Sequence, residues 1–176
     1  MDNMEVRPFS SSADYERAID YFLTADDSYL LGMGVDRSLL PGRDSWLQML
    51  VPDLGRDDPE KQAFYVAWMY NGEIIGHSNI NKIKFGEEAF IHLHMYKPDL
   101  RKAGLGTQFF KRSAQTFVER FKLKRLLCEP WAGNEAPNRV LLKAGFTFLR
   151  KYRTVPSLIQ FEQEVNRYEL TTSRKA

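Results

Sequence analysis

The sequence predicts an α+β fold (α/β in the broader sense): about four helices flank a mixed, mostly antiparallel β-sheet of about six or seven strands. Two turns provide the first observation. Asn71-Gly72 is a hairpin signal and Phe85-Gly86-Glu87-Glu88 is a second turn, so three consecutive strands form an antiparallel meander. The second observation is a predicted strand followed by a turn that contains Gly104 and Gly106. A helical pattern follows this turn. Together they exclude a repeated βαβ array.

The first third of the chain is the less regular part. Residues 4–9 read as a strand, and the serines and Asp14 that follow have the chemistry of a helix N-cap for a helix ending near Leu23. Residues 26–43 show no clear period. Asp44-Ser45 then caps a short helix through Leu50, and residues 52–59 form a polar loop.

The remaining two thirds carry the sheet. Strands are predicted at residues 62–70, 73–84, 89–96, 125–129, 146–155 and 159–170. Helices are predicted at residues 105–121 and 134–144, the second ended by Gly145. We expect one globular domain over residues 4–170 and a frayed tail at 171–176, because no linker or repeat interrupts the pattern.

Composition limits the classes of function. The net charge is +2, from 25 basic and 23 acidic residues spread through 176 positions, which argues against a nucleic-acid-binding face. The single cysteine, Cys128, excludes an internal disulfide and fits a reducing compartment. The acidic N-terminus lacks the apolar segment of a secretory signal, and no run approaches the ~20 apolar residues of a membrane span. We expect a cytoplasmic protein without membrane contact.

The turn at residues 95–107 is a candidate anion site. Gly104 and Gly106 permit a tight strand-to-helix turn with outward-pointing N–H groups, and Arg101 and Lys102 add positive charge at the helix N-terminus. A pyrophosphate suits such a turn. An ordinary glycine-containing loop is the alternative, and neither a dinucleotide-binding Gly-x-Gly-x-x-Gly nor a Gly-Lys-(Ser/Thr) loop is present.

Two motifs give the chain a family resemblance. Arg101-x-x-Gly104-x-Gly106 resembles the acyl-CoA signature of the GNAT N-acetyltransferases, and Asn134, a short helix and Lys143-x-Gly145-Phe146 resemble a second part of these enzymes. The order and spacing of the elements extend the resemblance over residues 4–170. The resemblance implies the GNAT fold, acetyl-CoA as co-substrate, no metal, and transfer of the acetyl group to a primary amine by direct attack.

The same resemblance implies the coenzyme contacts. The strand ending at Glu129-Pro130 would splay from the strand at 89–96 and open a slot for the thioester. Asn134 would bond the pantetheine arm, with an N-cap role as the alternative or in addition. The implied coenzyme-binding residues are His94, Met95 and Tyr96 through their main chains, then Arg101, Lys102, Ala103, Gly104, Leu105, Gly106 and Thr107 around the pyrophosphate, and Asn134.

The usual acid and base of the family are missing from their places. Leu141 stands where many relatives have a tyrosine acid, Phe90 where histone-type relatives have a glutamate base, and Pro137 where N-terminal acetylases often have serine. Asn134 remains the family residue near the reacting groups. Other side chains must therefore handle the proton.

The three histidines are the main candidates, because all lie in the hairpin formed by residues 73–96. A turn centred on Gly86-Glu87 pairs residues whose numbers sum to 173, which places His77, His92 and His94 on one polar face. Imidazoles titrate in the useful range. Three interpretations stay open: satisfied or solvated histidines, a base or orienting role for His92 (the first choice) or His94, and a metal site, for which no carboxylate completes the ligands.

The acceptor is the least determined feature. Asp26, Trp46, Glu129 and Trp131 are candidates for its pocket, with a solvated charge for Asp26 and a structural ion pair for Glu129 as alternatives. Glu129-Pro130 before Asn134, and Pro156 late in the chain, are similar to the siderophore and aminoglycoside branches of the family. We favour a small-molecule amine, then a protein or peptide α-amine, then a non-catalytic acyl-CoA-binding module, in a monomer or homodimer.

Overall fold

A single seven-stranded sheet organises the structure, a computed structural model that describes residues 3–101 and 104–172. Its strand order is β1-β2-β3-β4-β5-β7-β6. Only β4 and β5 pair in parallel within the described part, so the mixed, mostly antiparallel sheet is confirmed. The strands are β1 Met4–Pro8, β2 Ala63–Tyr70, β3 Glu73–Lys84, β4 Glu88–Met95, β5 Arg125–Cys128, β6 Thr147–Thr154 and β7 Gln163–Thr171.

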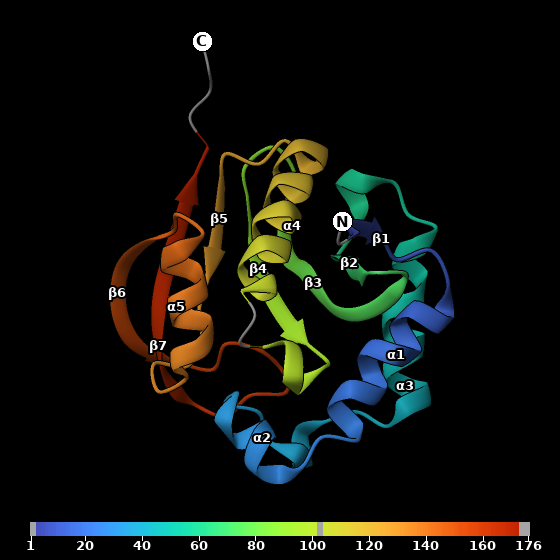
Figure 1. The fold of residues 1–176 in the computed structure, drawn as a ribbon, viewed down its shortest axis with the longest axis horizontal. Coiled ribbons are helices and arrows are strands. Elements are labelled where there is room, and N and C mark those ends of the chain that lie inside the picture. The colour runs from blue at the N-terminus through green and yellow to red at the C-terminus, as the bar shows by residue number, and fades with distance from the viewer. Residues whose placement is uncertain (1–2, 102–103, 173–176) are drawn as a thin grey trace.

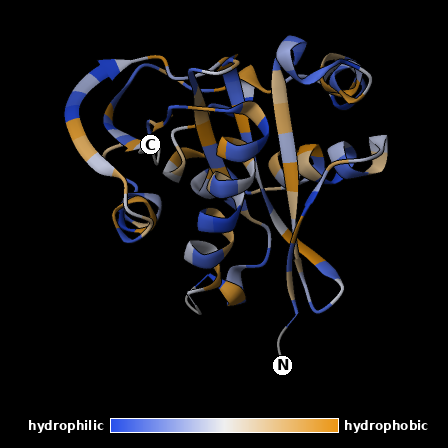
Figure 2. Cartoon of the chain, turned by 90° about the horizontal axis from the view of Figure 1, so that it is seen from above, coloured by the Kyte–Doolittle hydropathy of each residue, from blue (hydrophilic) through white to orange (hydrophobic). Residues whose placement is uncertain are grey.

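Helices cover both faces of this sheet (Figure 1). Side chains alternate along each strand, so Val66 and Trp68 of β2 pack on the α4 side, whereas Ala67 packs on the α1 side. Figure 2 shows the resulting bands of hydrophobic and hydrophilic residues along the strands. The helices are α1 Ser12–Leu23, α2 Asp27–Gly32, α3 Arg43–Leu50, α4 Leu105–Phe121 and α5 Glu135–Lys143, with 3₁₀ turns at Arg37–Leu39, Val51–Leu54, Asp58–Glu60 and Pro98–Leu100.

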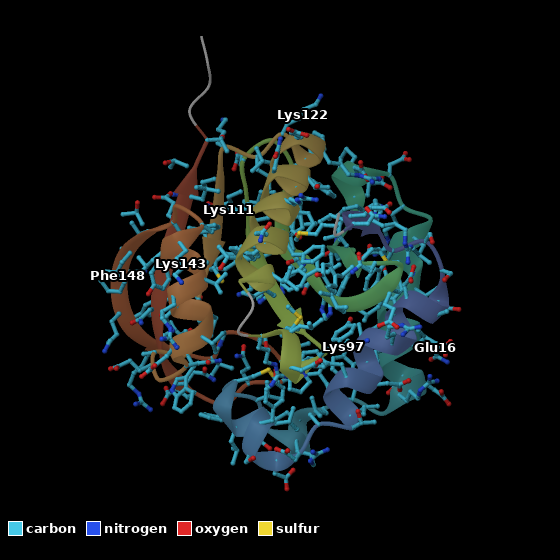
Figure 3. The ribbon with its side chains drawn as sticks, in the orientation of Figure 1. Glu16, Lys97, Lys111, Lys122, Lys143 and Phe148 are labelled. Atoms are coloured by element: carbon cyan, nitrogen blue, oxygen red, sulfur yellow. The ribbon has the colours of Figure 1, made fainter. Side chains whose placement is uncertain are left out.

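The main core lies between α4 and the centre of the sheet. Trp68 is fully buried and stacks on Phe109, with ring centroids 5.5 Å apart. Its indole Nε1 donates a 3.0 Å hydrogen bond to Ser113 Oγ, which in turn donates to the carbonyl of Phe109. Charged side chains such as Lys111 and Lys143 project from the outer sides of α4 and α5 (Figure 3).

Most predicted elements are present, with three corrections. The bounds predicted for residues 73–84 and 105–121 are those of β3 and α4. Residues 26–43 are more regular than predicted, because Asp26 caps the six-residue helix α2 by accepting a hydrogen bond from Tyr29 N. The last strand begins at Gln163 rather than 159, and it extends to Thr171, which pairs with Arg125 inside the predicted tail.

The register of the β3–β4 hairpin also differs from the prediction. His77 lies opposite His94, and Asn79 lies opposite His92, so paired numbers sum to 171. The cause is an irregularity between Asn81 and Lys84, where Lys82 has φ +49°. A shift of two residues preserves which face each side chain occupies, so the three histidines still share the polar face.

Gly76 permits the close approach of β4 to β3 at this point. A Cβ atom there would lie 2.4 Å from the carbonyl oxygen of His94 and 2.8 Å from the Trp68 ring. We expect Gly76→Ala to lower the free energy of unfolding by about 1–3 kcal/mol through overpacking. Urea denaturation measures the change. Gly55→Ala is the control, since nothing lies within 4 Å of its Cβ position; equal stability of the two variants would contradict the prediction.

Candidate active site

The predicted splay between β4 and β5 is present. The two strands pair over Glu88–Arg125, Ala89–Leu126 and Phe90–Leu127, and the described pairing ends there. Beyond Phe90 the edge of β4 is open, and a cavity of about 630 Å³ lies along it. The cavity is bounded by the end of β5, the start of α5, the N-terminal turn of α4 and α2.

Main-chain groups of alternate β4 residues face this opening. Tyr96 N donates a 2.8 Å hydrogen bond to the carbonyl of Ile75, so its N–H points toward β3 and is not available to a ligand. Because antiparallel pairing alternates, Leu93 and Met95 present their main-chain groups to the open edge. The prediction of contacts through His94, Met95 and Tyr96 therefore needs a correction: Met95 faces the slot, Leu93 joins it, and Tyr96 N–H is already bonded.

The N-terminal turn of α4 lies at the mouth of the cavity. Gly104 has φ +74° and begins the helix, which leaves the N–H groups of Leu105, Gly106 and Thr107 without intrahelical acceptors. Gly106 lines the cavity. Such a turn can bind an anion. The predicted contacts at Lys102 and Ala103 lie outside the described residues.

Arg101 is exposed but lies next to this turn, where it contacts two neighbours. Its guanidinium lies 4.4 Å from the Tyr29 ring centroid, and its Nη2 donates a 3.2 Å hydrogen bond to the carbonyl of Met95. Both Arg101 and Tyr29 line the cavity. A cation therefore stands between α2 and the predicted anion site.

Asn134 begins α5 but its side chain makes no capping hydrogen bond, although it lines the cavity. The side-chain amide is thus free for a ligand. Asn138, which sequence analysis did not single out, fixes this loop: its Nδ2 donates to the carbonyl of Asn134 (2.7 Å), and its Oδ1 accepts from Asn166 Nδ2 and Tyr168 Oη (both 2.8 Å). Its position one helical turn after Asn134 was the available signal.

Each histidine of the polar face has a different environment. His77 Nδ1 and Tyr96 Oη are 2.6 Å apart and hydrogen-bonded. His92 Nε2 donates to Asn81 Oδ1 at 3.1 Å, which fixes the tautomer and leaves the lone pair on Nδ1. His94 makes no hydrogen bond to a described residue, and its Nδ1 is buried.

Burial keeps these imidazoles neutral. It lowers the pKa of His77 to about 3, with His92 as a further cause, and it lowers the pKa of His92 to about 4, with the charge of Lys82 adding to the effect. The pKa of His94 is also well below its usual range through burial. The expectation that these imidazoles titrate near neutral pH is therefore wrong: desolvation disfavours their charged form.

A second cavity, of about 310 Å³, lies on the histidine face between α1, α3 and residues 156–159. Its walls are mostly apolar, with Ile19, Phe22 and Trp46 on one side. The two cavities are adjacent, and their junction is formed by the residues that line both: Asn81, Lys82, His92, His94 and Pro156. In residues 3–101 and 104–172, no group of three His, Cys, Asp or Glu side chains is placed to hold a metal ion.

The predicted acceptor residues lie in different places. Trp131 lines the first cavity and forms a β-bridge with Val165, whereas Trp46 lines the second. Asp26 lines the first cavity but is committed to capping α2. Glu129 also reaches this cavity, where Arg167 Nη1 lies 3.3 Å from its Oε1 and Tyr152 Oη donates to it. The structure thus shows the ion-pair interpretation for Glu129.

The residues that stand at the positions of the usual family acid and base have different surroundings. Leu141 is fully buried in the core, while Phe90 lines the first cavity below the Lys82 ammonium. Cys128 lies at the end of β5 beside the cavity, and burial raises the pKa of its thiol to about 12. Because the thiolate is the nucleophilic form, this cysteine is unreactive at neutral pH.

Comparisons with known proteins agree with this geometry. The acetyltransferase (GNAT) domain family matches residues 3–147, whereas the comparison with curated proteins gives no match. Among solved structures, the ribosomal-protein-S5-alanine acetyltransferase of Vibrio fischeri is similar, with 17% sequence identity and a TM-score of 0.77. The match covers 97% of this chain and 94% of the Vibrio fischeri chain.

Two further structures are similar, each at 15% identity with 96% of this chain and 93% of the other covered. RimL, a ribosomal alpha-N-protein acetyltransferase in complex with coenzyme A, has a TM-score of 0.75. MccE, the microcin C7 self-immunity acetyltransferase in complex with acetyl-CoA and AMP, has a TM-score of 0.73. No helix in the described part is long and apolar enough to cross a membrane. The family match spans most of the chain, and the chain belongs to the GNAT family of acetyl-CoA-dependent N-acetyltransferases.

Proposed function

We propose that this enzyme transfers the acetyl group of acetyl-CoA to the primary amine of a small molecule at the junction of the two cavities. The observation that carries the proposal is their arrangement. The larger cavity has an open β-edge and a helix N-terminus, which suit an extended coenzyme. The smaller one is mostly apolar, of small-molecule size, and opens onto the same histidine face.

The coenzyme occupies the larger cavity in this proposal. The pantetheine arm pairs with the main-chain groups of Leu93 and Met95 as an added strand, and the amide of Asn134 bonds its other side. The pyrophosphate lies on the free N–H groups of Leu105 to Thr107. Arg101 exchanges its bond to the Met95 carbonyl for a phosphate oxygen, a stronger charge-assisted partner.

The acceptor amine reacts in its neutral form, since an ammonium has no lone pair. His92 Nδ1 accepts a hydrogen bond from the amine and directs its lone pair at the thioester carbon; Asn81 holds the required tautomer. The C–N bond forms, the C–S bond breaks, and the amine proton leaves with the CoA thiol. An imidazole with a pKa of about 4 orients the amine and does not deprotonate an ammonium at pH 7.

This role of His92 predicts a specific pH profile. We expect kcat/KM to rise about tenfold per pH unit up to the pKa of the amine, with no inflection between pH 6 and 7. His92→Ala is expected to lower kcat about tenfold to a hundredfold at each pH while acetyl-CoA affinity is kept. Steady-state rates from pH 6 to 9 measure both. A wild-type inflection near pH 6.5 that the variant lacks would show that His92 is a conventional base.

The acceptor class is tested by CoA thiol release with mass spectrometry of the product. Small primary amines and short peptides with free α-amines are compared at equal concentration. We expect one thiol per N-acetylated small molecule. Acetylation of the peptides alone would replace the proposal by N-terminal protein acetylation, and thiol release without an acetylated product would leave hydrolysis.

A further inference from the structure

Lys82 occupies an unusual backbone position at the junction of the cavities. Residues 77, 79 and 81 of β3 face the histidine side, so simple alternation would direct residue 82 into the core with Ile80. The irregularity between Asn81 and Lys84, with φ +49° at Lys82, places one extra residue in β3. Asn81 and Lys82 therefore both line the cavities, and Ile83 returns to the core.

Lys82 is exposed to solvent at the rim of the cavities, and its backbone conformation there has an energetic cost. A left-handed conformation disfavours an L-residue with a β-carbon by roughly 1–2 kcal/mol. Glycine, or asparagine as at Asn71 in the preceding hairpin, is the usual occupant of such a position. Bulges of this kind re-aim side chains beside active sites. The lysine is turned toward the space where the acceptor must enter.

The Lys82 ammonium has no counter-ion in the described structure. Its Nζ lies 3.4 Å from the carbonyl oxygen of Pro156 and 4.8 Å from the centroid of the Phe90 ring. Among the described ion pairs none includes Lys82. By contrast, Lys84 two residues later pairs with Glu88 at 2.7 Å, outside both cavities.

The residues that the two cavities share carry one charge, and it is positive. Of the residues that line both cavities, Lys82 alone is charged, since the imidazoles of His92 and His94 are neutral. No Asp or Glu is among the described residues that line the smaller cavity. In the larger cavity, Glu129 is paired with Arg167, and Asp26 caps α2. A polyamine or other dication would bring a second positive charge beside Lys82, where the nearby carboxylates of the larger cavity already bond to Arg167 or to the N-terminus of α2.

We propose that Lys82 binds an anionic group on the acceptor, so that the substrates of this enzyme are amines that also carry a carboxylate or phosphate. The inference rests on the proposed acetylation of a small-molecule amine. The amine contacts His92, the anionic group contacts the Lys82 ammonium at the rim, and the apolar body fills the space beside Phe22 and Trp46. Such an acceptor satisfies the unpaired charge and keeps its neutral part in the apolar cavity.

The experiment compares kcat/KM, calculated for the concentration of the neutral amine because only that form reacts, for matched acceptors that differ in one charge. Each amino acid with an apolar side chain is paired with its carboxamide, and an aminoalkylphosphonate of similar length tests a phosphate-like anion. We expect the wild-type enzyme to prefer the anionic member about tenfold to a hundredfold, which is typical of a hydrogen bond to a charged group. The relative rates of carboxylate and phosphonate identify the anion.

Variants locate the preference. In Lys82→Met, which keeps the length and backbone demands of the side chain, the ratio of anionic to amide acceptor is expected to fall to near one. Lys84→Met is the matched control and keeps the wild-type rate and ratio, because Lys84 lies outside both cavities. Lys82→Glu is expected to reverse the preference toward cationic acceptors.

The outcomes separate the two proposals. Acetylation of amide and anionic acceptors at equal rates by the wild-type enzyme, or an unchanged ratio in Lys82→Met, would overturn the role of Lys82 and leave the proposed function standing. If no small amine of either kind is acetylated, the proposed function fails and the anion site fails with it. Circular dichroism and acetyl-CoA affinity confirm that each variant is folded.

Discussion

Gly104→Asp is expected to abolish measurable binding of acetyl-CoA while the protein stays folded. Gly104 begins α4 with φ +74°, and no heavy atom lies within 4 Å of its Cβ position. A side chain therefore fits at the cost of backbone strain alone, about 1–2 kcal/mol. The new carboxylate competes with the pyrophosphate for the N–H groups of the first helical turn.

The size of this effect follows from charge repulsion. Two unit charges 4 Å apart interact by ~4 kcal/mol at an effective dielectric constant of 20, which corresponds to roughly a thousandfold in affinity. Calorimetric titration with acetyl-CoA measures it, and free CoA is expected to behave alike. Gly104→Ala carries the strain without the charge and keeps binding within about tenfold.

Gly86→Asp is the second control. Gly86 also has a positive φ of +78° and open space at its Cβ position, but it lies in the β3–β4 turn, away from the cavities. The Gly86→Asp substitution adds the same charge and the same backbone strain, but at a distance from the proposed site. Equal affinities of Gly104→Asp and the wild-type protein would show that the pyrophosphate does not lie at this turn.

Lowering the pH is expected to destabilise the protein already at pH values well above those at which carboxylates titrate. Burial lowers the pKa of His77 to about 3 and of His92 to about 4, from 6.5 in an exposed imidazole. At pH values between the lowered pKa of each histidine and 6.5, the unfolded chain binds protons that the folded chain does not. Stability is thus fully present above pH 6.5 and falls as the pH decreases toward 4, by ~1.4 kcal/mol per pH unit for each histidine.

Urea denaturation at pH 7.5, 6.5, 5.5 and 4.5 measures this slope. His77→Gln removes one buried imidazole, so its stability is lower at pH 7.5 but declines less steeply on acidification. Asp14→Asn is the matched control for carboxylates. Burial raises the pKa of Asp14, but its hydrogen bonds to Arg7 and to Ser10 N lower it more, so its pKa falls below 3.8.

The stabilisation from Asp14 is therefore present above about pH 3.8 and lost at lower pH. Asp14→Asn should shift the whole curve above that pH without changing the slope from pH 6.5 to 4.5. A wild-type free energy of unfolding that is constant from pH 7.5 to 4.5 would contradict the buried, neutral state of the histidines.

Local chemistry explains why much of the fold was predictable. Asn71-Gly72 forms the β2–β3 turn, with φ +49° and +85°, so the sequence placed the start of β3 correctly. The long amphipathic period of α4 and its terminal glycine did the same for that helix. Each of these features depends on neighbours in the sequence.

What was missed depends on contacts between distant residues. The β3–β4 register requires the bulge at Lys82, which no glycine or proline marks in the sequence. Helix α2 is six residues long, too short for a hydrophobic period to emerge. Glu129 pairs with Arg167 across the sheet, and the low pKa values of the histidines come from burial under Tyr21, Phe22 and Phe9.

The coenzyme site was predictable in part for the same reason. The glycine turn before α4 and Asn134 at the start of α5 are local motifs, and both border the larger cavity. The alternation that turns Leu93 and Met95 toward the slot, and Tyr96 N–H away from it, follows from pairing with β3. The smaller cavity unites six separate stretches of the chain, which no single motif could indicate.

The open edge of β4 offers the most direct test of the account. Amide hydrogen exchange, resolved by residue with NMR, is measured with and without saturating acetyl-CoA. We predict that the amides of Leu93 and Met95, which face the slot, become protected, while the amide of Tyr96, already bonded to Ile75, is unchanged. Unchanged exchange at Leu93 and Met95 in the saturated protein would contradict the placement of the coenzyme along β4.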